Sequence, residues 1–193
     1  ADATADISQA DFLRFRDFFY RKTGIFFEES KRYFVDKRLQ ARMAATGYDQ
    51  FRGYFTFLRF QASQEELQAL INLLTVNETY FFREEYQFRC MVKSVLKEIV
   101  QGKRDQQAVR IWSMPCSSGE EAYSIALYLL EHWPPIEEID VEIMASDIDS
   151  RILAVAEEGL YTQRAVQYLP KLILQRYFQP RAEQRYQLNR EIR

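Results

Sequence analysis

Histidine and cysteine are nearly absent from this chain of 193 residues, which contains one histidine, His132, and two cysteines, Cys90 and Cys116. A single histidine excludes a metal site built from several histidines, and it argues against a Ser-His-Asp hydrolase. Two cysteines cannot build a disulfide framework, which favours a reducing compartment such as the cytoplasm. Cys116 is a weak candidate for a catalytic nucleophile, because no histidine lies near it in the sequence to activate it.

Long apolar runs and an excess of positive charge are also missing. No stretch of about eighteen apolar residues could span a membrane, and the acidic, polar N-terminus does not resemble a secretion signal. We therefore expect a cytoplasmic protein without membrane insertion. The 26 basic and 28 acidic side chains give a net charge of -2, which argues against a nucleic-acid partner. The apolar fraction of 47% is sufficient for a folded core.

Helical periodicity dominates the first hundred residues, and most of the aromatic side chains there are expected to fill the core between short helices. Ser63 and Glu66 are spaced as a capping box, in which each side chain bonds a backbone N–H at the start of a helix. The expected helices cover 9–22, 31–46, 51–58, 63–74 and 84–100. The α-helical spacing of the last one places Phe88, Met91, Val92, Val95 and Ile99 inward.

The pattern changes to alternating strands and helices after Gly102. Strands are expected at 109–114 and 141–146, each followed by a helix, which is typical of a parallel sheet with crossover helices. We expect an all-α domain over 1–80, then a linker helix and an α/β domain over 81–193. Two strands do not complete such a sheet. The tail after Pro170 predicts one helix and a hairpin, with 186–193 as a strand that lacks its partner.

The turn between the first expected strand and its helix carries Gly119, Glu120 and Glu121. Parallel-sheet folds hold nucleotides at such a turn, but the full GxGxxG pattern is absent and two glutamates would repel a phosphate. A cationic or hydroxyl-bearing ligand fits better. Asp147 follows the second strand, where an acidic residue typically accepts hydrogen bonds from a ribose. The alternatives are complementation of the helix dipole for the glutamates, and an N-cap for Asp147, which Asp149 or Ser150 could equally supply.

Two further stretches are candidates for function. The segment 75–84 between two helices contains Asn77, Thr79 and Arg83 beside aromatic rings, and its simpler interpretation is a turn whose rings fill a domain interface. The second helix has a local net charge of +4, from five basic residues and Asp36. It is either a solvated face or a surface for an acidic partner. Its basic residues are Lys31, Arg32, Lys37, Arg38 and Arg42.

Five stretches together resemble the CheR family of chemotaxis receptor methyltransferases. They are TVNETYFFRE (75–84), IWSMPCSSGEEAYSIAL (111–127), ASDID (145–149), GLY (159–161) and LQRYF (174–178). The resemblance implies an α/β enzyme with an all-α N-terminal domain and a Rossmann-like domain that binds S-adenosylmethionine and carries an inserted β-subdomain. The implied reaction is methylation of glutamate side chains on chemoreceptors. The family continues beyond this C-terminus, so the chain looks truncated, and Met114-Pro115-Cys116 departs from the small residues of many relatives.

The resemblance also implies roles for individual residues. Arg83 would act near the cofactor in positioning or catalysis. Asn77, Thr79, Glu121 and Asp147 would contact S-adenosylmethionine, with Asp147 at the ribose. The basic helix would meet the cytoplasmic helices of a methyl-accepting chemoreceptor through Lys31, Arg32, Lys37, Arg38 and Arg42. No metal is implied.

Three functions remain open at this point. The first is a glutamate O-methyltransferase, whose substrate is already a carboxylate at pH 7 and whose cofactor is an activated donor, so that catalytic histidine and metal are not needed. The second is a docking module without catalysis, with an incomplete cofactor domain. The third is a nucleic-acid-binding helical domain fused to a nucleotide-binding domain, which only the basic helix supports.

Overall fold

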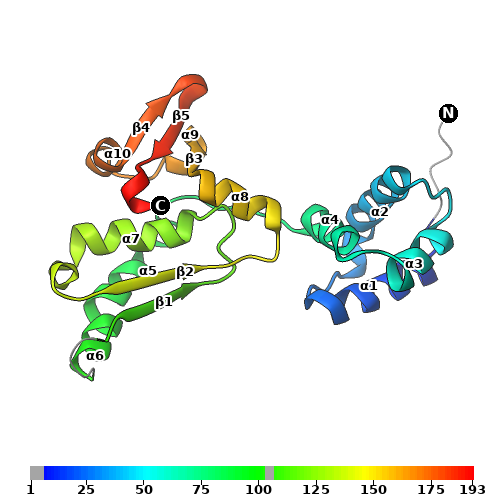
Figure 1. The fold of residues 1–193 in the computed structure, drawn as a ribbon, viewed down its shortest axis with the longest axis horizontal. Coiled ribbons are helices and arrows are strands. Elements are labelled where there is room, and N and C mark those ends of the chain that lie inside the picture. The colour runs from blue at the N-terminus through cyan, green and yellow to red at the C-terminus, as the bar shows by residue number, and fades with distance from the viewer. Residues whose placement is uncertain (1–6, 103–106) are drawn as a thin grey trace. The chain divides into compact units, whose positions relative to one another are not determined.

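The computed structural model describes residues 7–102 and 107–193, so the N-terminal residues 1–6, considered above for a signal sequence, lie outside the described residues. The chain divides into two compact units, Ala1–Val76 and Asn77–Arg193. Residues 77–80, assigned above to the helical domain, belong by their contacts to the second unit. The fold is an all-α unit followed by a mixed α/β unit, as expected (Figure 1). None of the described helices is long and apolar enough to cross a membrane.

The described residues of the first unit form four α-helices packed around an aromatic core. Ser8 caps the first helix by accepting a hydrogen bond from the Asp11 N–H, and left-handed Gly24 and Gly47 end the first two helices, as glycines commonly do. The helices are α1 (Gln9–Thr23), α2 (Arg32–Thr46), α3 (Phe51–Phe60) and α4 (Gln64–Leu74), with a 3-10 turn at Glu29–Lys31. Fully buried Phe12, Phe15 and Phe19 line the inner face of α1.

The predicted capping box at the start of α4 is wrong. Ser63 occupies the N-cap position, but its side chain makes no capping hydrogen bond. Glu66 is buried instead and accepts hydrogen bonds from the Tyr54 hydroxyl, at 2.6 Å, and from the Arg42 guanidinium, at 3.0 Å from Nε. A charged hydrogen bond in a buried site is stronger than an exposed cap, so the tertiary partners determine where this carboxylate points.

The second unit begins with a helix that contains a π-helical turn. Its segments are α5 (Glu85–Cys90), the π turn Met91–Val95 and α6 (Leu96–Gln101). The inward positions predicted for Val95 and Ile99 are wrong, since these side chains are 47% and 40% exposed, whereas Leu96 is buried. The π turn inserts one extra residue into the helix, so the inward face moves by one position beyond it.

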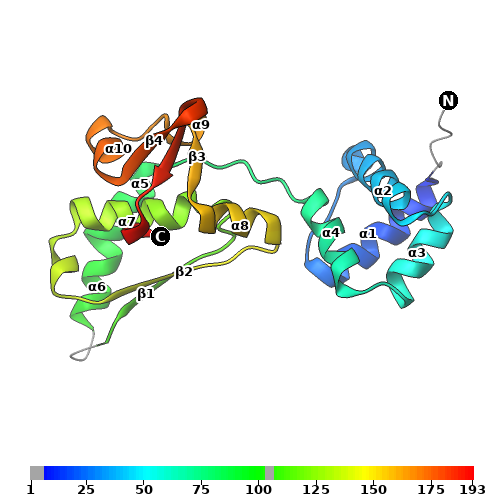
Figure 2. The ribbon, with the colours of Figure 1, turned by 45° about the horizontal axis from the view of Figure 1, so that its top comes forward.

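The described residues of the second unit also form two small sheets (Figures 1 and 2). Strands β1 (Val109–Ser113) and β2 (Val141–Ala145) pair in parallel, with Ser113 opposite Ala145, and α7 (Glu120–His132) packs on them. A 3-10 turn at Pro134–Glu137 follows α7, and α8 spans Ser150–Glu158. The parallel strands and their crossover helix confirm the α/β prediction.

The second sheet is antiparallel, in the order β3-β5-β4. Its elements are β3 (Leu160–Thr162), α9 (Gln163–Val166), α10 (Lys171–Tyr177), β4 (Phe178–Arg181) and β5 (Arg185–Leu188), with 3-10 turns at Ala182–Gln184 and Arg190–Ile192. The predicted hairpin is confirmed as β4 and β5. The prediction of a partnerless last strand is wrong, because β5 lies in the centre and pairs on both sides. Its second partner, β3, lies about 25 residues earlier, and such pairing leaves no local signal.

Candidate functional site

The turn between β1 and α7 is tied to the end of β2 by backbone hydrogen bonds. The Ser146 N–H donates to the Ser113 carbonyl at 3.1 Å, and the Cys116 N–H donates to the Ser146 carbonyl at 2.9 Å. Gly119 enters α7 with a φ of +90°, and a Cβ there would lie 2.9 Å from the Tyr123 ring. The single glycine of this turn is therefore required by backbone conformation and by a close contact inside the protein.

Two of the predicted carboxylates lie beside this turn. Glu121 accepts a hydrogen bond from the Ser113 hydroxyl at 2.7 Å. Asp147 accepts the Ser117 N–H at 2.8 Å and the Asp149 N–H at 2.9 Å. The carboxyl ends of parallel strands meet at one edge of a sheet, which is why residues so distant in sequence come together here. The result is a local concentration of negative charge.

The negative charge affects the pKa of the Cys116 thiol. Burial raises the pKa of its thiol above the ordinary value, and the negative charges of Asp147, Glu121 and Glu120 raise it further. A thiol with a raised pKa is a poor nucleophile at neutral pH.

Asp149, which the sequence offered only as an alternative cap, organises the loop after β2. It is 1% exposed, and its Oδ1 accepts the N–H groups of Arg151 and Ile152 at the start of α8. Its Oδ2 accepts the Asn77 amide at 2.9 Å. Because Asp149 caps α8, Asp147 is not needed for that task. Asn77 therefore contacts an acid that the sequence did not include among the site residues.

The segment that carries Arg83 is anchored by the two rings before it. Phe81 is fully buried, with its ring edge-on to Tyr161 at 4.8 Å between centroids, and Phe82 packs against Tyr128 at 5.7 Å. The Phe82 N–H donates to the Ser124 hydroxyl at 3.0 Å. These rings belong to the core of the second unit, which corrects the alternative in which they fill an interface between domains.

Arg83 itself is exposed at the end of a strained turn. Phe82 and Glu84, on either side of it, have φ values of +58° and +57°, which cost non-glycine residues about 1–2 kcal/mol each. The Arg83 guanidinium donates to the Glu78 carbonyl at 3.2 Å and lies 5.9 Å from the centre of the Tyr80 ring. Strain of this kind is often retained at functional positions.

A pocket of about 460 Å³ opens beside this turn. Asn77, Thr79 and Arg83 line it together with Ser118 and Glu120. Glu121 and Asp147 are not among its lining residues, so the five predicted cofactor residues form two groups. The groups are linked, since the Ser117 hydroxyl donates to the Asn77 carbonyl at 3.4 Å and the Ser117 N–H donates to Asp147.

Glu120 and Glu121 are adjacent but differ in environment. Glu120 is 3% exposed and accepts the Ser118 hydroxyl at 2.6 Å, and burial raises its pKa above the ordinary value. Glu121 is exposed beyond its bond to Ser113. Glu121 is therefore the glutamate of this pair that is accessible to a ligand.

The five basic residues predicted to bind a partner do not share one exposed surface, and Lys31 lies in the 3-10 turn before α2 rather than in the helix. Arg38 donates to the carbonyls of Leu73 and Phe34 and stacks on the Phe34 ring. Arg32 bonds Asp36, and Arg42 bonds Glu66. The two exposed cations of the set are Lys31 and Lys37.

Both units match models of one protein family. Residues 10–75 match the CheR methyltransferase all-alpha domain, and residues 77–193 match the CheR methyltransferase SAM binding domain. The chain belongs to the CheR methyltransferase family. The division between the two matches coincides with the boundary between the two compact units, Val76 and Asn77.

Curated relatives of this CheR family member span both units. The chain is 61% identical over 187 residues to "Chemotaxis protein methyltransferase 2" of Vibrio cholerae, covering 97% of this chain and 65% of that protein. It is 30% identical to the "Chemotaxis protein methyltransferase" of Borreliella burgdorferi, covering 95% and 66%. The protein of that name from Salmonella typhimurium is 35% identical, covering 89% and 57%. The chain thus spans about 57–66% of the length of these three relatives.

The residues at the site fit S-adenosylmethionine, the ligand named by the matching domain model. That cofactor carries a sulfonium, an ammonium and ribose hydroxyls, all of which are stabilised by carboxylates. Glu121 is accessible, and Asp147 is partly exposed with acceptor capacity beyond its two backbone partners. The same negative charge disfavours a pyrophosphate, which agrees with the missing glycine-rich motif.

Proposed function

We propose that this chain serves the transfer of a methyl group from S-adenosylmethionine to glutamate carboxylates of bacterial chemoreceptors, as a protein-glutamate O-methyltransferase acting in the cytoplasm. The proposal is carried by one observation: Glu121 and Asp147 lie together at the carboxyl ends of β1 and β2 in a chain whose two units match the two CheR domains. The printed names of the relatives, chemotaxis protein methyltransferases, support the signalling context.

In this proposal the residues of the chain bind the cofactor and orient the reacting groups. Glu121 accepts hydrogen bonds from the ammonium end of the cofactor, and Asp147 accepts them from the ribose hydroxyls. Asn77 and Thr79 contact it from the segment after α4, and Arg83 positions the reacting groups. When bound, S-adenosylmethionine supplies an activated methyl group on its sulfonium. The acceptor carboxylate is ionised at neutral pH, so the main task of the protein is alignment.

Calorimetric titration of S-adenosylhomocysteine into the chain tests the cofactor assignment. Glu121→Gln removes a charge but keeps an acceptor for Ser113, and Asp147→Asn keeps one acceptor for the turn. Each is expected to weaken binding about 10-fold to 100-fold, since a hydrogen bond to a charged group contributes about 1.5–3 kcal/mol. Glu137→Gln, at an exposed position of the 3-10 turn after α7, is the matched control.

The outcomes separate the candidate functions. Normal binding by both site variants would overturn the residue assignment. No binding by the unaltered chain would favour the alternative, a docking module with an incomplete cofactor domain. Methyl transfer is tested separately with labelled S-adenosylmethionine and a chemoreceptor cytoplasmic fragment. Arg83→Ala should lower turnover more than it weakens cofactor binding if Arg83 positions the reacting groups.

We place the contact with a partner on α2 and on the 3-10 turn that precedes it. Lys31 and Lys37 are exposed and suit contact with acidic receptor helices. Arg32, Arg38 and Arg42 contribute to the same helix but also hold it to neighbouring segments. Lys31→Glu with Lys37→Glu should therefore weaken receptor binding without unfolding the domain. Receptor binding that is unchanged by this double substitution would refute the contact.

A further inference from the structure

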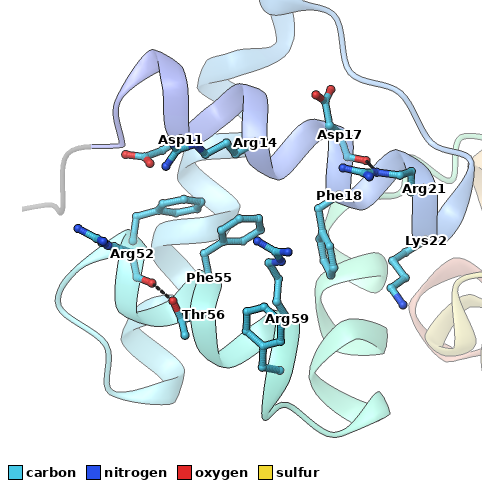
Figure 3. A pocket seen from close by; sticks show the side chains of 12 residues that line it. Asp11, Arg14, Asp17, Phe18, Arg21, Lys22, Arg52, Phe55, Thr56 and Arg59 are labelled. Carbon is cyan, nitrogen blue, oxygen red and sulfur yellow. Dashed lines mark hydrogen bonds between the residues drawn. The ribbon is translucent and has the colours of Figure 1, made fainter.

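The first unit has a half-open groove between α1 and α3, with a volume of about 620 Å³ (Figure 3). None of its lining residues belongs to the cofactor site or to the basic helix α2. The groove therefore needs an explanation of its own.

Cations dominate the groove. Five basic residues and two acidic ones line it, which gives a local net charge of +3 from five minus two. All five basic side chains are exposed, and within the described residues none of them has a carboxylate within ion-pair distance. The basic residues are Arg14, Arg21, Lys22, Arg52 and Arg59.

The two acids of the groove have other contacts. The Asp11 carboxylate accepts the Ser8 hydroxyl at 2.6 Å. Asp17 lies 3.5 Å from Arg16, which does not line the groove. Arg21 donates to the Asp17 carbonyl at 3.2 Å, but within the described residues no carboxylate neutralises the five cations, in contrast to Arg32 and Arg42 of α2.

The floor of the groove is aromatic. The rings of Phe18 and Phe55 meet edge to face at 5.6 Å between centroids. Phe60 is 71% exposed, and the Arg59 guanidinium lies 4.8 Å from its ring centre. In Figure 3 the Arg59 guanidinium lies beside the Phe55 ring, between it and Phe18, and Arg52 and Lys22 lie farther out on opposite sides. A partner that fits this groove must therefore present both apolar surface and negative charge along its length.

The spacing of the cations indicates the shape of that partner. Arg14 and Arg21 on α1 are seven residues apart, and so are Arg52 and Arg59 on α3. Seven residues are two helical turns, or about 10.5 Å of rise. A partner helix with carboxylates seven residues apart and an apolar side chain between them has the same repeat. A helix with an apolar face seated between two others is a common mode of recognition.

We propose that the α1–α3 groove binds an acidic amphipathic helix of a partner protein, whose carboxylates pair with the basic side chains of α1 and α3 and whose apolar side chains rest on Phe55 and Phe60. The two acids inside the groove, Asp11 and Asp17, disfavour a continuous phosphate backbone such as that of a nucleic acid. The inference uses only the first unit and no cofactor, so it is independent of the methyl transfer proposed above.

A labelled helical peptide tests this directly by fluorescence anisotropy with the whole chain. The probe has about 20 residues, which is long enough for helix formation in water, with glutamates seven apart and leucines between them. A peptide with glutamine in place of each glutamate is the control probe. We expect the acidic probe to bind about tenfold more tightly than the glutamine probe, and its affinity to fall as salt is raised.

Variants locate the binding surface. Arg52→Glu with Arg59→Glu reverses charge at both ends of α3 and should weaken binding of the acidic probe by about tenfold or more. Arg89→Glu with Lys97→Glu makes the same charge change at exposed positions of the second unit and should leave affinity within twofold. Phe60→Ala alters no charge and removes an exposed ring, so it should weaken binding without affecting the fold.

Three results would overturn the proposal. One is equal affinity for the acidic and glutamine probes. Another is an equal loss in the groove variant and in the control variant. The third is stronger binding of an unstructured polyanion, such as a DNA oligonucleotide, than of the acidic helix. If the charge-reversed variant unfolds by circular dichroism, Phe60→Ala decides, and unchanged affinity in that variant refutes the aromatic contact.

Discussion

Replacement of Glu66 should destabilise the first unit strongly, although Glu66 lies outside both candidate sites. Its side chain is 7% exposed and receives hydrogen bonds from the Tyr54 hydroxyl and from two nitrogens of Arg42. The pKa values of both partners are raised above their ordinary values, that of Tyr54 mainly by burial and that of Arg42 mainly by the hydrogen bond to Glu66. Glu66→Ala leaves a buried hydroxyl and a partly buried guanidinium without their acceptor.

The expected loss can be ranked across three variants. Removing one partner of a buried pair costs about 3–5 kcal/mol, and the Arg42 side chain is still 22% exposed, so Glu66→Ala should cost about 3 kcal/mol. Tyr54→Phe removes one hydrogen bond to a charged group and leaves Glu66 paired with Arg42, for about 1.5 kcal/mol. Glu66→Gln keeps the shape but turns a donor toward the guanidinium, which should cost about 2 kcal/mol.

Urea unfolding of the whole chain provides the measurement. Both tryptophans, Trp112 and Trp133, lie in the second unit. Tryptophan fluorescence therefore reports the second unit, and circular dichroism reports the helices of both. Glu66→Ala should shift the circular dichroism transition by the amount given, and Glu65→Ala, at the exposed neighbouring position, should shift it by less than about 0.5 kcal/mol. Equal stability of Glu66→Ala and Glu65→Ala would refute the reasoning.

Three other predictions concern the β1–α7 turn. Gly119→Ala should lower the free energy of unfolding by about 2–3 kcal/mol, because φ is +90° and a Cβ would lie 2.9 Å from the Tyr123 ring. Gly102→Ala is the control, and tryptophan fluorescence follows the unfolding of both variants. A loss below about 1 kcal/mol in Gly119→Ala would contradict the predicted strain. Iodoacetamide at pH 8 should label exposed Cys90 before Cys116, whose pKa is raised by burial, and Asp147→Asn should accelerate labelling of Cys116. Burial raises the pKa of Glu120, so the folded state holds that proton more tightly and stability falls as pH rises from the ordinary carboxylate pKa through the folded one. As the pH is raised from 4 to 7, the free energy of unfolding of Glu120→Gln should therefore increase relative to that of the unaltered chain. A difference between the two proteins that does not change with pH would contradict this.

Local sequence patterns predicted most of the helices and strands but not the tertiary contacts of individual side chains. Gly24 and Gly47 end helices where the sequence predicted, and the strands at 109–114 and 141–146 pair in parallel. Glu66 shows where local reading fails, since its spacing from Ser63 matches a cap while Arg42 and Tyr54 approach it only in the fold.

In the candidate site, too, the sequence predicted the positions of residues along the chain but not the contacts between residues that are distant in sequence. The sequence placed Glu121 in the turn region after one strand and Asp147 after the next, and the parallel pairing of these strands brings both carboxylates beside one turn. Nothing local distinguished Asp149 as the residue that caps α8 and holds Asn77. The separation of the five predicted residues into two linked groups depends on how the turn after Phe81 is anchored, and that anchoring involves Ser124, Tyr128 and Tyr161, all far away in the sequence.

The π turn at Met91–Val95 has a consequence for how this helix tolerates changes in length. Phe88 and Leu96, on either side of it, are both buried and lie eight positions apart. In a regular α-helix eight positions would rotate them about 80° from each other, whereas seven positions would leave them within about 20°. Deleting a single residue from 91–95 would thus produce an ordinary α-helix with both side chains still facing the core. A deletion before Phe88 or after Leu96 would leave their spacing at eight positions and turn one end of the helix away from its partners.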